Sequence, residues 1–315
     1  MDVVFDGMDS YPETQSEFDA LVASQEVSQR YLASIRWPNG FICPSCGHPS
    51  AWMLATGQYQ CMRCRGRVTV TAGTLFQDTR YPLTVWFQAI WYLVGQKNGA
   101  SALGIQRILG LGSYHTAWAW LHRLRRAMVR PDRDGLSGTV EVDETYWGAA
   151  QTGKRGRGAA GKIMILVAIE HTGNKLGRLR LQRIPDVQGK TLEAAIHSAV
   201  MPGSTIETDG LQSYNGVAAK GYTHQVIRVE AIDDLLPHVH LVVSLLKRWL
   251  LEPHQGGVQA THLDYYLDEF TFRFNRRNSH SRGMLFRRVL EYAVLLPPVR
   301  KADLQAKLEL GQHYI

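Results

Sequence analysis

The sequence has few cysteines, no long apolar run and no apolar segment near its N-terminus. Only 4 of the 315 residues are cysteine, which excludes a disulfide-dense secreted scaffold. No stretch of about 18 apolar residues occurs, so we expect no membrane-spanning helix. Residues 1–20 are acidic and lack the apolar core of a signal peptide. These absences predict a cytoplasmic globular protein with no membrane partner.

Positive charge is concentrated in one part of the chain. The whole sequence carries a net charge of +7, and residues 76–140 alone account for +5. A basic segment favours a polyanionic partner but does not say which one. At roughly 150 residues per domain, the length predicts about two domains and leaves room for a small extra module.

All four cysteines lie within one short segment. Cys43 and Cys46 form one Cys-x-x-Cys pair, and Cys61 and Cys64 form a second pair 14 residues later. Two such pairs on a hairpin supply the four thiolates that a tetrahedral Zn²⁺ ion requires. The alternatives are two disulfides or a redox-active pair. The spacing predicts a zinc ribbon, in which the metal provides much of the folding free energy.

The basic segment has the pattern of three helices. Apolar residues at helical spacing predict helices over 83–96, 101–109 and 114–128, and Gly110 and Gly112 separate the last two. A basic helix after a short glycine-containing turn matches a helix-turn-helix DNA reader. The alternative is a helical hairpin with a solvated basic face. The predicted DNA-binding side chains are His122, Arg123, Arg125 and Arg126.

The second half of the chain has the pattern of an α/β domain. Strands are predicted over 139–149, 162–170, 176–184 and 205–210, with a helix over 191–200 before the last strand. This order matches a mixed-sheet, ribonuclease H-like core. Asp143 on the first strand and Asp209 on the fourth would then meet. Paired carboxylates suit Mg²⁺ or Mn²⁺ in two-metal phosphodiester chemistry. Taken alone, each aspartate is more often a surface or turn-capping residue, and it is the strand order that favours a metal site for the pair.

Several motifs in combination resemble a known family. They are CPSCG with CMRC, GSYHTAWAWLHRLRRAM, VEVDETYWG, TIETDGLQSY, HLVVSLLKRW and HLDYYLDEFTFRFNRR, and the resemblance covers roughly residues 20–292. The chain resembles bacterial insertion-sequence transposases of the zinc-ribbon plus ISXO-like DDE type. The resemblance implies a ribonuclease H-like catalytic domain, divalent metal ions, and Asp143 and Asp209 as the first two catalytic carboxylates.

The third catalytic position departs from the pattern of that family. Members commonly carry Glu or Asn seven residues before a lysine on the last catalytic helix, and here Lys247 is preceded at that distance by His240. On a helix these two residues share a face. An imidazole binds divalent ions, although it suits Mn²⁺ better than Mg²⁺. His240 is therefore expected as the third metal ligand and Lys247 as a phosphate contact, with a merely structural histidine as the alternative.

The resemblance also implies an activity and an organisation. We expect a DNA transposase that binds the terminal inverted repeats of its element and acts on target DNA as a homodimer or larger synaptic complex near the nucleoid. The alternatives are an inactive, transposase-derived DNA-binding regulator and a structure-selective nuclease. The expected divisions are an N-terminal lead (1–35), the zinc ribbon (36–75), the helical DNA-binding segment (76–135), the catalytic domain (136–295) and a tail (296–315).

Overall fold

The computed structural model describes residues 10–130, 132–148, 162–227, 236–251, 254, 257–299 and 303–304. The chain divides into two compact units, one from Met1–Arg130 with Ser279–Gln305 and the other from Pro131–Asn278 with Ala306–Ile315. The glycine-rich basic loop that follows the first strand of the second unit lies outside the described residues at 149–161, as does most of the expected tail. No described helix is long and apolar enough to cross a membrane.

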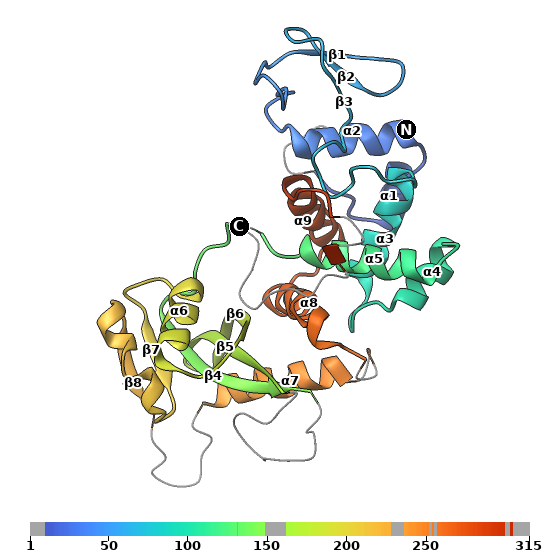
Figure 1. The fold of residues 1–315 in the computed structure, drawn as a ribbon. Helices are drawn as coiled ribbons and strands as arrows, with labels where there is room; N and C mark the ends of the chain where they lie inside the picture. The colour runs from blue at the N-terminus through green and yellow to red at the C-terminus, as the bar shows by residue number, and fades with distance from the viewer. Residues whose placement is uncertain are drawn as a thin grey trace. The chain divides into compact units, whose positions relative to one another are not determined.

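The first unit contains a small three-stranded sheet and a group of helices (Figure 1). The antiparallel sheet consists of β1 (Ala51–Met53), β2 (Tyr59–Cys61) and β3 (Arg67–Val68). The helices are α1 (Gln15–Leu21), α2 (Gln25–Arg36), α3 (Leu83–Gly95), α4 (Ala102–Leu109), α5 (Tyr114–Arg126) and α9 (Arg282–Leu295). The three helices predicted between residues 83 and 128 are confirmed, with ends that differ by at most two residues.

Helix α9 belongs to this first unit, although the sequence placed residues 136–295 in one catalytic domain. Its Phe286 is fully buried and contacts the rings of Phe18, Tyr31, Phe87 and Trp91, with centroids 5.4–6.3 Å apart. Aromatic rings at such separations add packing energy to their burial. The aromatic core, which draws on both ends of the chain, therefore decides where α9 packs.

The second unit is built on one five-stranded mixed sheet. Its strands are β4 (Thr139–Trp147), β5 (Ile163–Thr172), β6 (Lys175–Ile184), β7 (Thr205–Thr208) and β8 (Thr223–Val226). The spatial order is β6-β5-β4-β7-β8; β4, β5 and β6 are antiparallel neighbours, whereas β7 runs parallel to both β4 and β8. The remaining helices are α6 (Gly189–Ala199), α7 (Pro237–Leu251) and α8 (Leu263–Asn275).

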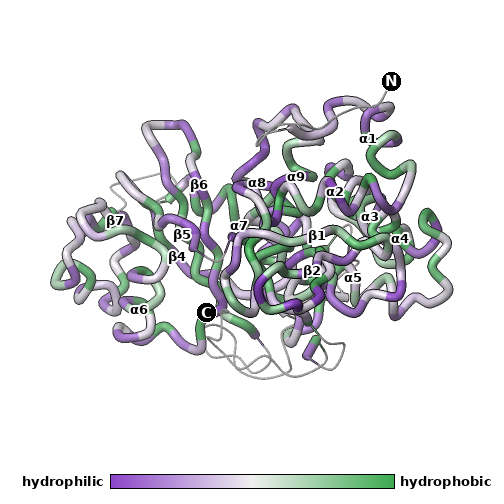
Figure 2. Tube along the Cα trace, turned by 90° about the horizontal axis from the view of Figure 1, so that it is seen from above, coloured by the Kyte–Doolittle hydropathy of each residue, from purple (hydrophilic) through white to green (hydrophobic). Residues whose placement is uncertain are grey.

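Each face of this sheet has its own apolar core. Val140 and Val142 of β4 pack with α6, whereas Val167 of β5 packs with α7 and α8 on the opposite face. Polar and apolar residues alternate along β6, as Figure 2 shows. Because successive strand residues point to opposite faces, Glu141, Asp143 and Thr145 of β4 lie on the α7 side. Glu141 and Asp143 thus lie together on the α7 side of β4.

Candidate active site and zinc ribbon

The four cysteine sulfurs converge at the ribbon sheet. Sγ of Cys43 lies 3.7 Å from Sγ of Cys64, and Sγ of Cys46 lies 3.6 Å from Sγ of Cys61. All four are free thiols rather than disulfides, and they form one group of potential ligands. Four sulfurs at about 2.3 Å from a tetrahedral zinc are separated by about 3.8 Å. The thiols therefore fit a zinc ion.

The two cysteine knuckles share a backbone geometry that favours the thiolate form. Gly47 and Arg65, each directly after the second cysteine of a pair, both adopt positive φ values of 71° and 59°. The turn that results lets the Ser45 N–H bond the Cys43 sulfur and lower the pKa of that thiol. Burial opposes ionisation of Cys61, but the N–H groups of Cys64 and Arg63 lower its pKa to about 6. Metal ligation requires these thiolates.

The predicted DNA-binding side chains of α5 do not form an exposed face. His122 (0% exposed), Arg125 (2%) and Arg126 (8%) are buried, and Arg123 is half-buried. The basic-face prediction is therefore wrong for those three residues. The physical reason is that nearly every residue of α5 after Trp118 is buried. The protein therefore covers this helix on more sides than the single apolar face that its sequence pattern predicts. The exposed residues of α5 lie at its N-terminal end, at Tyr114 and His115.

Asp143 lies in the middle of β4, and Asp209 comes directly after the end of the neighbouring strand β7. The parallel pairing of β4 with β7 places Glu141 opposite Glu207, and each aspartate follows two residues after its member of that pair. Asp143 is mostly buried, with 19% of its side chain exposed. Burial raises the pKa of Asp143, and the nearby charge of Asp209 raises it further. A buried carboxylate whose ionisation is disfavoured by a neighbouring carboxylate is typical of a cation site.

His240 reaches Asp143 from helix α7. Its Nε2 lies 3.4 Å from Oδ2 of Asp143, and its side chain is 45% exposed. Lys247 lies two turns further along α7 and is exposed as well. In the described parts of the chain, neither Asp143 nor Asp209 pairs with a lysine or arginine. The structure thus brings Asp143, Asp209 and His240 together without a fixed positive charge between the carboxylates.

Glu144 supports β4 from the opposite face. It is buried, and its Oε2 accepts a hydrogen bond of 2.7 Å from the hydroxyl of Tyr214. Its own N–H donates to Oδ1 of Asp143 at 2.7 Å. Burial and the adjacent Glu144 charge raise the pKa of Tyr214 far above its ordinary value, so Tyr214 remains a donor. Glu144 therefore acts on the site through its backbone contact with Asp143.

Substitution Tyr214→Phe is expected to lower the free energy of unfolding by about 2 kcal/mol, because it removes a hydrogen bond to a buried carboxylate. Urea denaturation followed by circular dichroism measures the loss. Tyr222→Phe is the matched control, since its hydroxyl donates to the neutral carbonyl of Val200 at 2.9 Å and its loss should cost about 1 kcal/mol. A smaller effect for Tyr214→Phe than for the control would contradict the bracing role of Tyr214.

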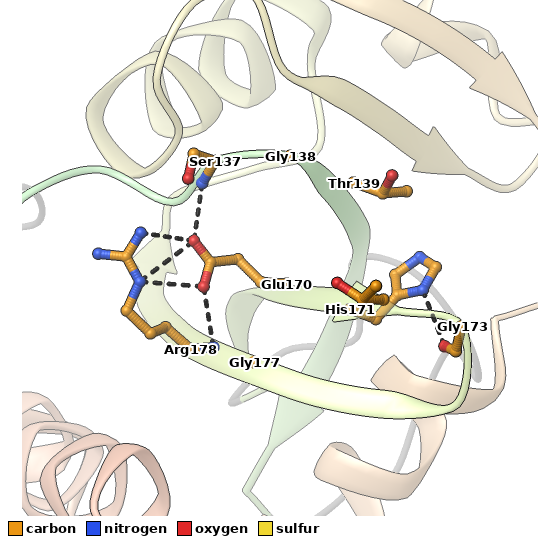
Figure 3. A pocket seen from close by; sticks show the side chains of 9 residues that line it. Ser137, Gly138, Thr139, Glu170, His171, Gly173, Gly177 and Arg178 are labelled. Carbon is orange, nitrogen blue, oxygen red and sulfur yellow. Dashed lines mark hydrogen bonds and ion pairs between the residues drawn. The ribbon is translucent and has the colours of Figure 1, made fainter.

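A second group of polar side chains lies beside the aspartates and was missed by the sequence reading. Glu141, His171 and His238 place possible ligand atoms within 4.8 Å of one another. His171 also lines a pocket of about 440 Å³ together with Glu170 and Arg178 (Figure 3). In that pocket Glu170 is held by Arg178 at 2.6 Å and by the Ser137 N–H at 2.7 Å. The alternation of β4 did place Glu141 on the face of Asp143, but nothing in the sequence placed the histidines there.

Two protein-family models match this chain, one in each of its two units. Residues 23–67 match the family described as transposase zinc-ribbon domain, and residues 135–275 match the family described as ISXO2-like transposase domain. The chain is also 26% identical over 275 residues to a protein of Halobacterium salinarum described as an uncharacterized protein in transposable element ISH50, covering 79% of this chain and 90% of that one. The chain therefore belongs to the insertion-sequence transposases that join a zinc ribbon to an ISXO2-like transposase domain.

Proposed function

We propose that this chain is a DNA transposase that binds the terminal inverted repeats of its element, cuts the DNA at the element end and transfers the strand end to target DNA. The observation that carries the proposal is the Asp143–Asp209 pair, each member two residues beyond the paired residues Glu141 and Glu207 of neighbouring parallel strands. The family of the chain adds to it, since both matched domains are transposase domains.

The sheet supports a ribonuclease H-like catalytic domain. Numbered from β4, the spatial order of strands is 3-2-1-4-5, and only the second strand runs against its neighbours on both sides. In this arrangement the first and fourth strands are parallel neighbours, so Asp143 and Asp209, which both follow the paired segment, would face one reacting phosphate. This topology explains why the site needs residues about 66 positions apart in the chain.

The residues of the site fit divalent ions and a phosphodiester substrate. Asp143 and Asp209 supply hard oxygen donors, which suit Mg²⁺ or Mn²⁺. When bound, such ions stabilise the charge on the entering and leaving oxygens of an in-line displacement. His240 adds a nitrogen donor beside Asp143. Lys247, on the same exposed side of α7, is assigned to a phosphate oxygen of the DNA backbone.

DNA recognition is assigned to the first unit. Helices α4 and α5 are joined by a short turn in which Gly110 has a left-handed conformation with φ of 61°. In a helix-turn-helix reader, residues at the N-terminal end of the second helix contact the bases. In α5 those residues are the exposed Tyr114 and His115. Two element ends must be held together for transfer, so we assign the active form to a homodimer or larger synaptic complex.

The proposal is tested by strand cleavage of DNA that carries the element ends, against the same DNA with shuffled ends, in Mg²⁺ and in Mn²⁺. We expect end-dependent cutting that releases a 3′-hydroxyl and that is faster in Mn²⁺, because His240 is a softer ligand than a carboxylate. His240→Ala should reduce the rate, and His240→Glu should restore activity in Mg²⁺.

Binding without cutting in either metal would favour the regulator. Cutting that ignores the end sequence would favour a structure-selective nuclease. Unchanged cutting by His240→Ala would remove His240 from the ligand set while leaving the aspartates in it.

A further inference from the structure

The carboxylates beside the catalytic aspartates have an unusual charge environment. Glu141 on β4 and Glu207 on β7 are direct register partners on the same face of the sheet, and like charges in that position repel. Their side chains are only 3% and 17% exposed. Across the described segments, neither carboxylate pairs with a lysine or arginine, and their charged partners are histidines alone. The pair therefore needs a positive charge that the sheet does not provide.

His171 is oriented with one ring nitrogen toward these carboxylates. Its Nδ1 lies 3.2 Å from the carbonyl oxygen of Gly173, as Figure 3 shows. A carbonyl only accepts hydrogen bonds, so Nδ1 carries the proton in the neutral ring. Nε2 is then a lone pair, yet it lies 3.0 Å from Oε2 of Glu207. A lone pair and a carboxylate oxygen separated in this way are placed as two donor atoms of one cation would be.

His238 contacts the other carboxylate of the pair from helix α7. Its Nδ1 lies 2.5 Å from Oε1 of Glu141, while Oε2 of Glu141 accepts the N–H of Val239 at 2.8 Å. The rings of His171 and His238 are stacked with centroids 4.5 Å apart and an interplanar angle of 18°. The possible ligand atoms of Glu141, His171 and His238 all lie within 4.8 Å of one another, which is close enough for one divalent ion to serve the whole group.

We propose that Glu141, His171 and His238, with Glu207 beside His171, bind a divalent transition-metal ion at a site separate from the Asp143–Asp209 pair. Two imidazoles and a carboxylate are a donor set that Zn²⁺ accepts and that Mg²⁺ does not favour. The Gly173 carbonyl orients His171 in the way that outer partners orient metal-bound histidines. The ion joins β4, β5 and α7, which fixes His240, two residues beyond His238, over Asp143.

The test is a metal count that requires no DNA cleavage. The full chain is loaded with Zn²⁺, dialysed against excess Mg²⁺ to fill the aspartate site, and analysed by mass spectrometry for zinc. We expect two zinc ions per chain in the wild type, one of them in the ribbon, and one per chain in both His171→Ala and His238→Ala. Glu207→Gln should keep the second ion but weaken its binding roughly 10- to 100-fold.

Two controls separate ligation from misfolding and from the catalytic site. His197→Ala, which alters a histidine of α6 bonded to Tyr222, and His240→Ala should both retain two zinc ions. Co²⁺ in place of Zn²⁺ should show thiolate charge-transfer absorption of the ribbon in every variant, which reports a folded, loaded ribbon. A wild-type count of one zinc, or a count of two in His171→Ala, would overturn the proposal, as would loss of the second ion in His240→Ala alone. Because no step uses DNA, these results stand apart from the success or failure of the transposase assay.

Discussion

Asp143→Asn is expected to reduce metal-dependent strand cleavage by at least about 10³-fold while leaving binding of the element ends unchanged. Asparagine keeps the size of the side chain but removes the charge that attracts a divalent ion. The ions supply several kcal/mol of charge stabilisation in the transition state, and about 4 kcal/mol corresponds to 10³-fold in rate. Cleavage assays and gel-shift binding on the same DNA measure the two quantities.

The same substitution should stabilise the fold in the absence of added Mg²⁺ or Mn²⁺. Burial and the charge of Asp209 raise the folded-state pKa of Asp143. The contribution of protonated Asp143 to the free energy of unfolding is fully present below the unfolded-state pKa of about 3.9. It is lost as the pH rises through the folded-state pKa. At neutral pH the ionised Asp143 therefore destabilises the ion-free protein, and the neutral amide of the variant relieves that cost. Thermal unfolding at pH 7 should show a higher melting temperature for Asp143→Asn, a difference that narrows as the pH is lowered.

A control aspartate distinguishes the site from a general charge effect. Asp186 caps a loop by accepting the Gln188 N–H at 3.0 Å, and its pKa is lowered rather than raised. Asp186→Asn should leave strand cleavage unchanged and should not raise the melting temperature at pH 7. Asp209→Asn should reduce strand cleavage as Asp143→Asn does. Full activity in Asp143→Asn would remove the aspartate pair from the mechanism.

Cys43→Ser is expected to unfold the ribbon and to abolish specific DNA binding. The ribbon strands contain only two or three residues each, so little apolar surface holds them together. Structural zinc contributes roughly 10–16 kcal/mol to the folding of comparable small modules. Hydrogen exchange should therefore show loss of protection in β1, β2 and β3, while the amides of β4 and β5 keep theirs.

Ser45→Ala is the matched control for this loss. Ser45 lies between the two cysteines of the same knuckle, and it contributes its backbone N–H to Cys43, which alanine retains. Zinc content and exchange protection should then equal those of the wild type. A Cys43→Ser variant with a protected ribbon would show that zinc does not hold this module together.

Elements with a strong local pattern could be predicted from the sequence. The apolar run of β5 and the alternation of β6 define their strands before any contact is known. The helical period over 83–95 and the serine caps before α4 and α9 act within a few residues. Asp143 and Asp209 were placed together because strand order alone brings their strands side by side.

Features that depend on long-range packing could not be predicted. The histidine pair forms because the β4–β5 register and the approach of α7 bring His171 and His238 together from 67 positions apart. Helix α5 was assigned a solvated basic face, since the chain pattern does not show how many sides of a helix will be covered. Arg125 has the polar character of a surface residue, yet only 2% of it is exposed.

The placement of α9 has a consequence for the order of synthesis. The ribosome adds about 5–20 residues per second from the N-terminus, so Phe18, Phe87 and Trp91 emerge long before Phe286. The intervening β4–β8 sheet is complete before α9 leaves the exit tunnel. A nascent chain therefore holds a finished five-stranded sheet while the aromatic core of its first unit still lacks a helix. Premature termination just before α9 should leave a protein whose first unit, rather than its sheet, is degraded first.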